Sequence, residues 1–152
     1  MTRSPGAVTV HHVTAALREL DATLDVLDEA AARALGIGRT DLRAMEIISR
    51  AGRVSAKTLA VHLRLTSGTV TALIDRLVAA GIAVRKPDPA DRRKVSLELT
   101  PRGRDREARL FGPLGRRVGA ALRRYDPGEL ALILGFLKSV TDVTEQHRRS
   151  IL

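Results

Sequence analysis

The stretch from Ser55 to Thr100 constrains the fold more than any other part of the chain, because it combines helical apolar spacing, tight turns and a basic hairpin. Thr66 precedes a run of apolar residues at helical spacing and is expected to be an N-cap, while Gly81 closes the same helix as a C-cap. The apolar positions are Val70, Leu73, Ile74, Leu77 and Val78. Ser55 can cap a shorter helix over residues 56–63. These two helices, joined by a tight turn, predict a helix-turn-helix.

A basic hairpin is expected directly after this pair of helices. Residues 82–86 and 94–100 have strand character and flank a turn that is rich in proline, aspartate and arginine. Residues 53–55 are too short for more than a stub of strand. The pattern predicts a mainly α fold with a small β-hairpin wing, that is, a winged helix-turn-helix.

The charge balance favours a polyanionic partner. Lysine and arginine number 26 against 17 acidic residues, which gives a formal net charge of +9. A basic composition is also typical of arginine-rich proteomes, so the motif has to decide between the two interpretations. The chain has no tryptophan, one tyrosine and two phenylalanines, too few for a stacking platform that binds single strands. Double-stranded DNA is therefore the expected partner.

Several classes of site and location are excluded or disfavoured. The absence of cysteine excludes disulfides, thiolate metal sites and cysteine-based redox sensing. The four histidines do not have the spacing of a zinc site. No segment resembles a signal peptide, and no apolar run approaches the roughly 20 residues of a membrane span. We therefore expect a cytoplasmic protein without metal, cofactor or membrane contact.

The start of the second helix carries small and hydroxyl residues on the side away from its apolar face. Such residues let a backbone approach a groove and offer hydrogen bonds to phosphates or base edges. Serine and threonine also favour helix N-termini for capping alone, which is the interpretation adopted for Thr66. Later on the same helix, Arg76 can reach a phosphate or be held by an acidic neighbour within the domain. The expected DNA contacts on this helix are Ser67, Gly68, Thr69, Thr71 and Arg76.

The hairpin turn supplies a second expected DNA contact through Arg92, Arg93 and Lys94. An arginine at a hairpin tip can enter a narrow minor groove, where the negative potential is enhanced. Asp91, two residues before Arg93, can accept hydrogen bonds from the guanidinium or from turn amides and so fix the direction of the arginine. Asp88 is a second candidate support. The alternative is a solvated charged turn without a ligand.

The flanking segments predict long amphipathic helices. From Val13 to Ala31 the apolar residues alternate three and four apart, which is a heptad seam that needs a partner helix. Gly36 and Gly38 end this helix, and Thr40 with Asp41 start the next one. A second copy of the chain is one source of the partner.

After Thr100, an arginine-rich helix is expected over residues 101–124, with a kink or split at Gly112–Pro113 because proline removes a helical hydrogen bond. Asp126 and Pro127 then begin a last helix with one apolar face. The flanking helices expose more apolar surface than a DNA-binding module can cover, so we expect a homodimer. Residues 1–38 and 101–152 form the expected dimerisation region, and residues 39–100 the DNA-binding region.

The stretch LTSGTVTALIDRLVAAGIAVRKPDPADRRKVSLELTPRGRD resembles the MarR family of bacterial transcription regulators over roughly residues 40–105. The shared features are Asp75-Arg76-Leu77, Gly81, Arg85, Asp88 with Asp91 and Arg93, and Leu99-Thr100 with Gly103. The resemblance implies an obligate homodimer that binds a palindromic operator, with Arg93 in the minor groove and Asp91 supporting it. It further implies a repressor that is released by a small phenolic or amphipathic effector.

Chemistry alone suggests His11, His12, Arg43 and Tyr125 as effector contacts, and a structural or surface role is the favoured alternative for each. A sequence-tolerant architectural DNA-binding protein without an effector is the alternative function. An enzyme is disfavoured, because Ser55 and His62 lie seven residues apart on one helix and would not align as nucleophile and base.

Overall fold

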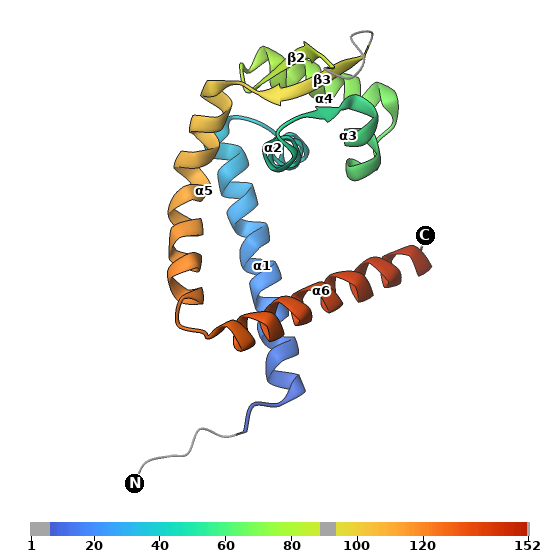
Figure 1. Cartoon of the computed structure of the whole chain (residues 1–152). Helices are drawn as coiled ribbons and strands as arrows, with labels where there is room; N and C mark the ends of the chain where they lie inside the picture. Colours follow the sequence, from blue (N-terminus) through green and yellow to red (C-terminus); the bar gives the residue numbers. More distant parts are fainter. Residues whose placement is uncertain (1–6, 89–93, 152) are drawn as a thin grey trace. The chain divides into compact units, whose positions relative to one another are not determined.

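The computed structural model describes residues 7–88 and 94–151 (Figure 1). Within these residues the order of elements is α1 (Val10–Leu35), α2 (Arg39–Ala51), β1 (Val54–Ser55), α3 (Ala56–Leu63), α4 (Ser67–Ala79), β2 (Ala83–Pro87), β3 (Val95–Leu99), α5 (Pro101–Leu122) and α6 (Pro127–Ser150). The chain divides into two compact units, residues 1–107 and 108–152. The predicted mainly α fold with a small sheet is confirmed.

Local capping signals determine most of the helix ends. Thr66 accepts a hydrogen bond from the backbone N–H of Thr69, and Ser55 accepts one from Thr58, as predicted. Gly81 has a φ of 67°, and the N–H of Ile82 reaches back to the carbonyl of Leu77 at 2.9 Å. This closure needs a left-handed residue, which explains the glycine. The C-cap is nevertheless Ala80 rather than the predicted Gly81, which lies one residue beyond it.

The second helix begins slightly earlier than the sequence indicated. The N-cap of α2 is Gly38, so the helix starts at Arg39 rather than at Thr40. As a glycine, this N-cap supplies no side-chain hydrogen bond. Asp41 is consequently inside the first turn and is buried. Its position allows its carboxylate to contact another element.

The sheet of the first unit has three strands in the order β1-β3-β2, all antiparallel. Val84 lies opposite Glu98, and Lys86 opposite Ser96. The hairpin was predicted correctly, and residues 53–55 do contribute only a stub, which pairs with β3 through Val54 and Leu97. Strand β1 thus links the base of the wing to α2 and α3.

The core of the first unit lies between α2, α3, α4 and β3. It is formed by side chains that are at most a few per cent exposed, and burial of each large one contributes about 1.5–3 kcal/mol. The largest of them are Leu42, Met45, Ile48, Leu59, Leu73, Leu77, Ile82 and Leu97. Because α4 buries one face here, its opposite face is presented to solvent.

Beyond residue 107 the chain is helical and carries little buried surface. Asp126 and Glu129 form a capping box at the start of α6, with Pro127 in the first helical position, as predicted. Of the predicted kink or split at Gly112–Pro113, the split is wrong, because α5 continues through Pro113, and the kink stays a prediction. One proline removes one hydrogen bond, and the helical turns on both sides of it are retained. In the part of the chain that the structure describes, no helix is long and apolar enough to cross a membrane.

Candidate nucleic-acid interface

The N-terminal turn of α4 presents the predicted small residues to solvent. Ser67, Gly68, Thr69 and Thr71 are all exposed, and an added Cβ at Gly68 would meet no atom within 4 Å. The neighbouring Val70 is buried and anchors this turn to the core. The backbone of α4 is therefore accessible along its outer face, as contact with a groove requires.

The hydroxyl groups on this face differ in how they are engaged. Thr71 donates to the carbonyl of Ser67 at 2.9 Å, which leaves its lone pairs as acceptors. The hydroxyl of Thr69 lies 2.8 Å from that of Thr66. Ser67 has no side-chain partner among residues 7–88 and 94–151, so its hydroxyl is available as a donor. Within the described residues, Thr71 has therefore used its donor, Thr69 shares one contact with Thr66, and Ser67 has a free donor.

The turn that leads into α4 contains a residue in the left-handed region. Arg64 has a φ of 56° and follows the last residue of α3, and the N–H of Leu65 then bonds to the carbonyl of Ala60 at 3.0 Å. A non-glycine residue adopts this conformation with difficulty, so the surrounding contacts must enforce it. The turn sets the direction in which α4 leaves α3.

The arms of the wing are paired up to the N–H of Asp88, which bonds to the carbonyl of Lys94 at 2.9 Å. Lys94 is exposed, and Asp88 is half-buried. Asp91, Arg92 and Arg93 lie outside the described residues, so their expected contacts stay predictions.

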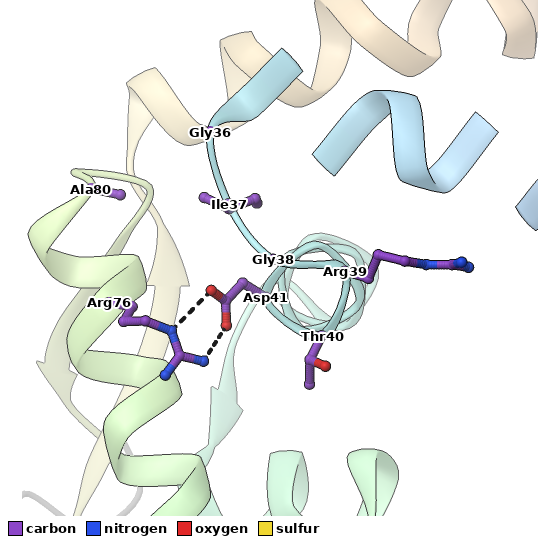
Figure 2. A pocket seen from close by; sticks show the side chains of 8 residues that line it. All are labelled: Gly36, Ile37, Gly38, Arg39, Thr40, Asp41, Arg76 and Ala80. Atoms are coloured by element: carbon purple, nitrogen blue, oxygen red, sulfur yellow. Dashed lines mark hydrogen bonds and ion pairs between the residues drawn. The ribbon is translucent and has the colours of Figure 1, made fainter. Parts of the chain in front are cut away.

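Two consecutive residues of α4 form ion pairs with two different elements. Arg76 donates from Nε and Nη2 to the two carboxylate oxygens of Asp41 on α2, at 3.0 and 2.6 Å (Figure 2). Asp75 accepts from Arg85 of β2 at 2.5 Å. The pKa of Arg76 is raised further by its hydrogen bonds to Asp41. Of the two alternatives for Arg76, the structure shows the one with an acidic neighbour.

Glu98 links the strands at the base of the wing. It accepts from Lys86 Nζ at 3.0 Å and also pairs with Arg53, which precedes β1. Hydrogen bonds from Lys86 and then Arg53 lower the pKa of the Glu98 carboxyl below its ordinary value. The carboxylate thus joins β2, β3 and the segment before β1.

A pocket of about 410 Å³ lies beside the Asp41–Arg76 pair (Figure 2). It is lined by the turn between α1 and α2, by the start of α2 and by the end of α4, through residues 36–41, Arg76 and Ala80. The candidate effector residues His11, His12, Arg43 and Tyr125 are not among its lining residues. His12 instead takes part in the capping box of α1 with Thr9. The role of these four residues as ligand contacts stays a prediction.

Residues 35–94 match the model of the MarR family. The chain is also 36% identical over 130 residues to the uncharacterized HTH-type transcriptional regulator YcgE of Bacillus subtilis, covering 86% of this chain and 84% of that protein. This chain belongs to the MarR family. It is a DNA-binding transcription regulator of the winged-helix type, like the other members.

Two further comparisons are informative. The HTH-type transcriptional repressor YetL of Bacillus subtilis is 28% identical over 116 residues, which cover 76% of this chain and 68% of YetL. The fold matches the crystal structure of NadR in complex with 4-hydroxyphenylacetate, with a TM-score of 0.62, 18% identity and coverage of 92% of this chain and 97% of that one. The second likeness concerns the fold alone.

Sequence reasoning missed the acidic partners of α4 and the wing. Asp41 was interpreted as a residue at a helix start, and Glu98 received no role. A signal was present for Asp41, because it lies four residues before Met45 and seven before Ile48, which is the spacing of one helix face. The identity of its partner, 35 residues further along, has no local signal.

Proposed function

We propose that this MarR-family regulator is a repressor that binds a palindromic operator as a homodimer. The observation that carries the proposal is the exposed N-terminal turn of α4 above a buried anchor at Val70, on a chain with a net charge of +9. Ser67, Gly68, Thr69 and Thr71 contact the major groove, and the wing contacts the minor groove through Arg92 and Arg93, with Lys94 beside them. The repressor activity named for YetL supports the sign of regulation.

Dimer formation is supported by apolar side chains that the single chain leaves exposed. On α1, Leu20 and Leu24 of the heptad seam are 51% and 44% exposed. On α6, Leu134 and Leu137 are 53% and 47% exposed. Apolar stripes of this kind are unfavourable in water and are covered in the dimer. We assign residues 1–38 and 101–152 to dimerisation and residues 39–100 to DNA binding.

We further propose that a small phenolic or amphipathic effector releases the protein from DNA, and that the protein acts in the cytoplasm by binding rather than by catalysis. The likeness to NadR, which was crystallised with such a molecule, supports the class of effector. Any effector must bind the two states of the dimer with different affinities, since equal affinities would shift no equilibrium.

The test is selection of bound duplexes from a random pool, followed by sedimentation of the protein with the selected DNA. A dimeric regulator enriches two inverted half-sites whose centres are about 10 base pairs apart or a multiple of that spacing. Repeating the selection with a panel of aromatic acids and phenols identifies the effector. A pool that stays random points instead to the sequence-tolerant architectural protein, and a monomer on a single half-site contradicts the dimer.

A further inference from the structure

Helix α4 is held on its core by closely packed apolar side chains, which make no directional contacts. Its buried face is the apolar stripe of Val70, Leu73, Ile74 and Leu77. Apolar contacts are non-directional, so they limit the roll of the helix less sharply than a hydrogen bond does. A helix with its side chains has a radius of about 5–6 Å, so a roll of about 20° moves a side-chain tip by about 2 Å. That displacement breaks a hydrogen bond to a base edge.

Directional contacts to α4 come from the ion pairs of Asp75 and Arg76. Consecutive residues of an α-helix point about 100° apart, so these two side chains leave the helix on different flanks. Asp75 is bound to Arg85 on the wing, and Arg76 is bound to Asp41 on α2. Helix α4 supplies the carboxylate of one pair and the guanidinium of the other. A roll in either direction therefore lengthens one of the two pairs.

The pair with Asp41 is the more restrictive of the two. Both carboxylate oxygens are used, and a guanidinium that donates from Nε and Nη2 has one planar geometry. The side chain of Asp41 is only 6% exposed, whereas Asp75 is 60% exposed. Asp41 is thus fixed within α2 and provides a reference point for α4 that solvent and salt weaken least.

We propose that Asp41 is a positioning residue for DNA recognition: through Arg76 it fixes the roll of α4, with Asp75–Arg85 as the opposing tether. Asp41 has no contact with DNA in this account, and Arg76 is occupied by Asp41 rather than by a phosphate. The inference rests on the proposed function, in which α4 contacts the major groove.

The test measures binding of the full chain to its selected duplex and to a scrambled duplex over a series of salt concentrations, by fluorescence anisotropy. Asp41→Asn is nearly isosteric and removes the charge, whereas Arg76→Lys keeps the charge and removes the planar fork. We expect each to weaken binding to the selected duplex at least tenfold, to leave binding to the scrambled duplex within about twofold, and to leave the salt slope unchanged. Asp25→Asn is the matched control, because it removes the exposed Asp25–Arg39 pair, which does not involve α4.

The opposite interpretation makes different predictions. If Arg76 binds a phosphate, Asp41→Asn releases it and binding is unchanged or tighter, while Arg76→Gln lowers the salt slope by about 0.9. Either result overturns the inference. If Asp41→Asn does not fold, wild-type affinity of Arg76→Lys overturns it equally well. If the wild-type chain itself does not distinguish the two duplexes, the proposed function fails and the inference fails with it. If the wild type distinguishes them and both variants bind like the wild type, only the inference fails.

Discussion

Replacement of Gly103 by alanine should destabilise the first unit, because the start of α5 touches the backbone that leaves α4. Gly103 is buried, and a Cβ built on it would lie 2.2 Å from the carbonyl oxygen of Ile82. Ordinary contact begins at 3.4 Å, so the two backbones must separate by about 1.2 Å, the difference between these two distances. The neighbouring atom is a main-chain oxygen, which cannot rotate away as a flexible side chain can.

The required separation disturbs a small network around Thr100. Its hydroxyl lies 2.7 Å from the carbonyl of Gly81, its N–H bonds to the carbonyl of Ile82 at 2.9 Å, and it accepts from the N–H of Gly103 at 2.9 Å. Overpacking costs about 1–3 kcal/mol, and each hydrogen bond that is weakened costs up to about 1 kcal/mol. Alanine recovers about 1 kcal/mol of helix propensity. If two of these hydrogen bonds are lost, the expected net loss is about 2–4 kcal/mol.

The assay is urea unfolding followed by circular dichroism at one protein concentration, since dimerisation makes stability depend on concentration. In a thermal melt, the same loss of stability corresponds to a lowering of Tm by about 5–15 °C for a chain of this length. Gly115→Ala is the matched control on the same helix, because an added Cβ there meets no atom within 4 Å. It should leave stability unchanged or raise it by up to about 1 kcal/mol. A Gly103→Ala midpoint equal to that of the wild type would refute the close contact between α5 and Ile82.

Three further substitutions separate DNA contact from stability. Gly68→Ala should retain the urea midpoint, since the space around it is open, but weaken operator binding at least tenfold in an anisotropy titration, because the methyl group faces the groove. Arg93→Ala should weaken operator binding without lowering Tm, and unchanged affinity would exclude the proposed role of the wing. Glu98→Gln tests the carboxylate between Lys86 and Arg53. Because the pKa of Glu98 is lowered in the folded state, the ionised carboxylate stabilises the fold at pH values above 4.5, its ordinary pKa. This stabilisation is lost as the pH falls through the folded-state pKa. The variant should therefore lose less stability than the wild type in urea melts between pH 7 and about pH 3, and equal losses would contradict the pairing.

The sequence predicted features whose causes are local. The caps at Thr66, Ser55 and Asp126 act over three residues, and the left-handed glycines at Gly36 and Gly81 close the helices that precede them. Apolar spacing likewise indicated which face of α4 is buried, and hence which residues remain for DNA. Such signals are contained within a single turn of chain.

Features that depend on tertiary contact were missed. Asp41 meets Arg76 only because α2 and α4 pack together, and spacing along the chain does not reveal a pair 35 residues apart. Gly103 was recognised as part of a motif, but its reason is the approach of Ile82, which only the folded chain shows. At Pro113 the helix does not split, since the cost of one lost hydrogen bond does not by itself end a long helix.

The most direct measurement is the ratio of the dissociation constants for the selected duplex and for a scrambled duplex of equal length, at the same salt concentration. A sequence-specific regulator that places α4 in the major groove should bind the selected duplex at least about a thousandfold more tightly. A ratio near one would show that the affinity comes from phosphate contacts alone, and would contradict recognition of an operator by α4.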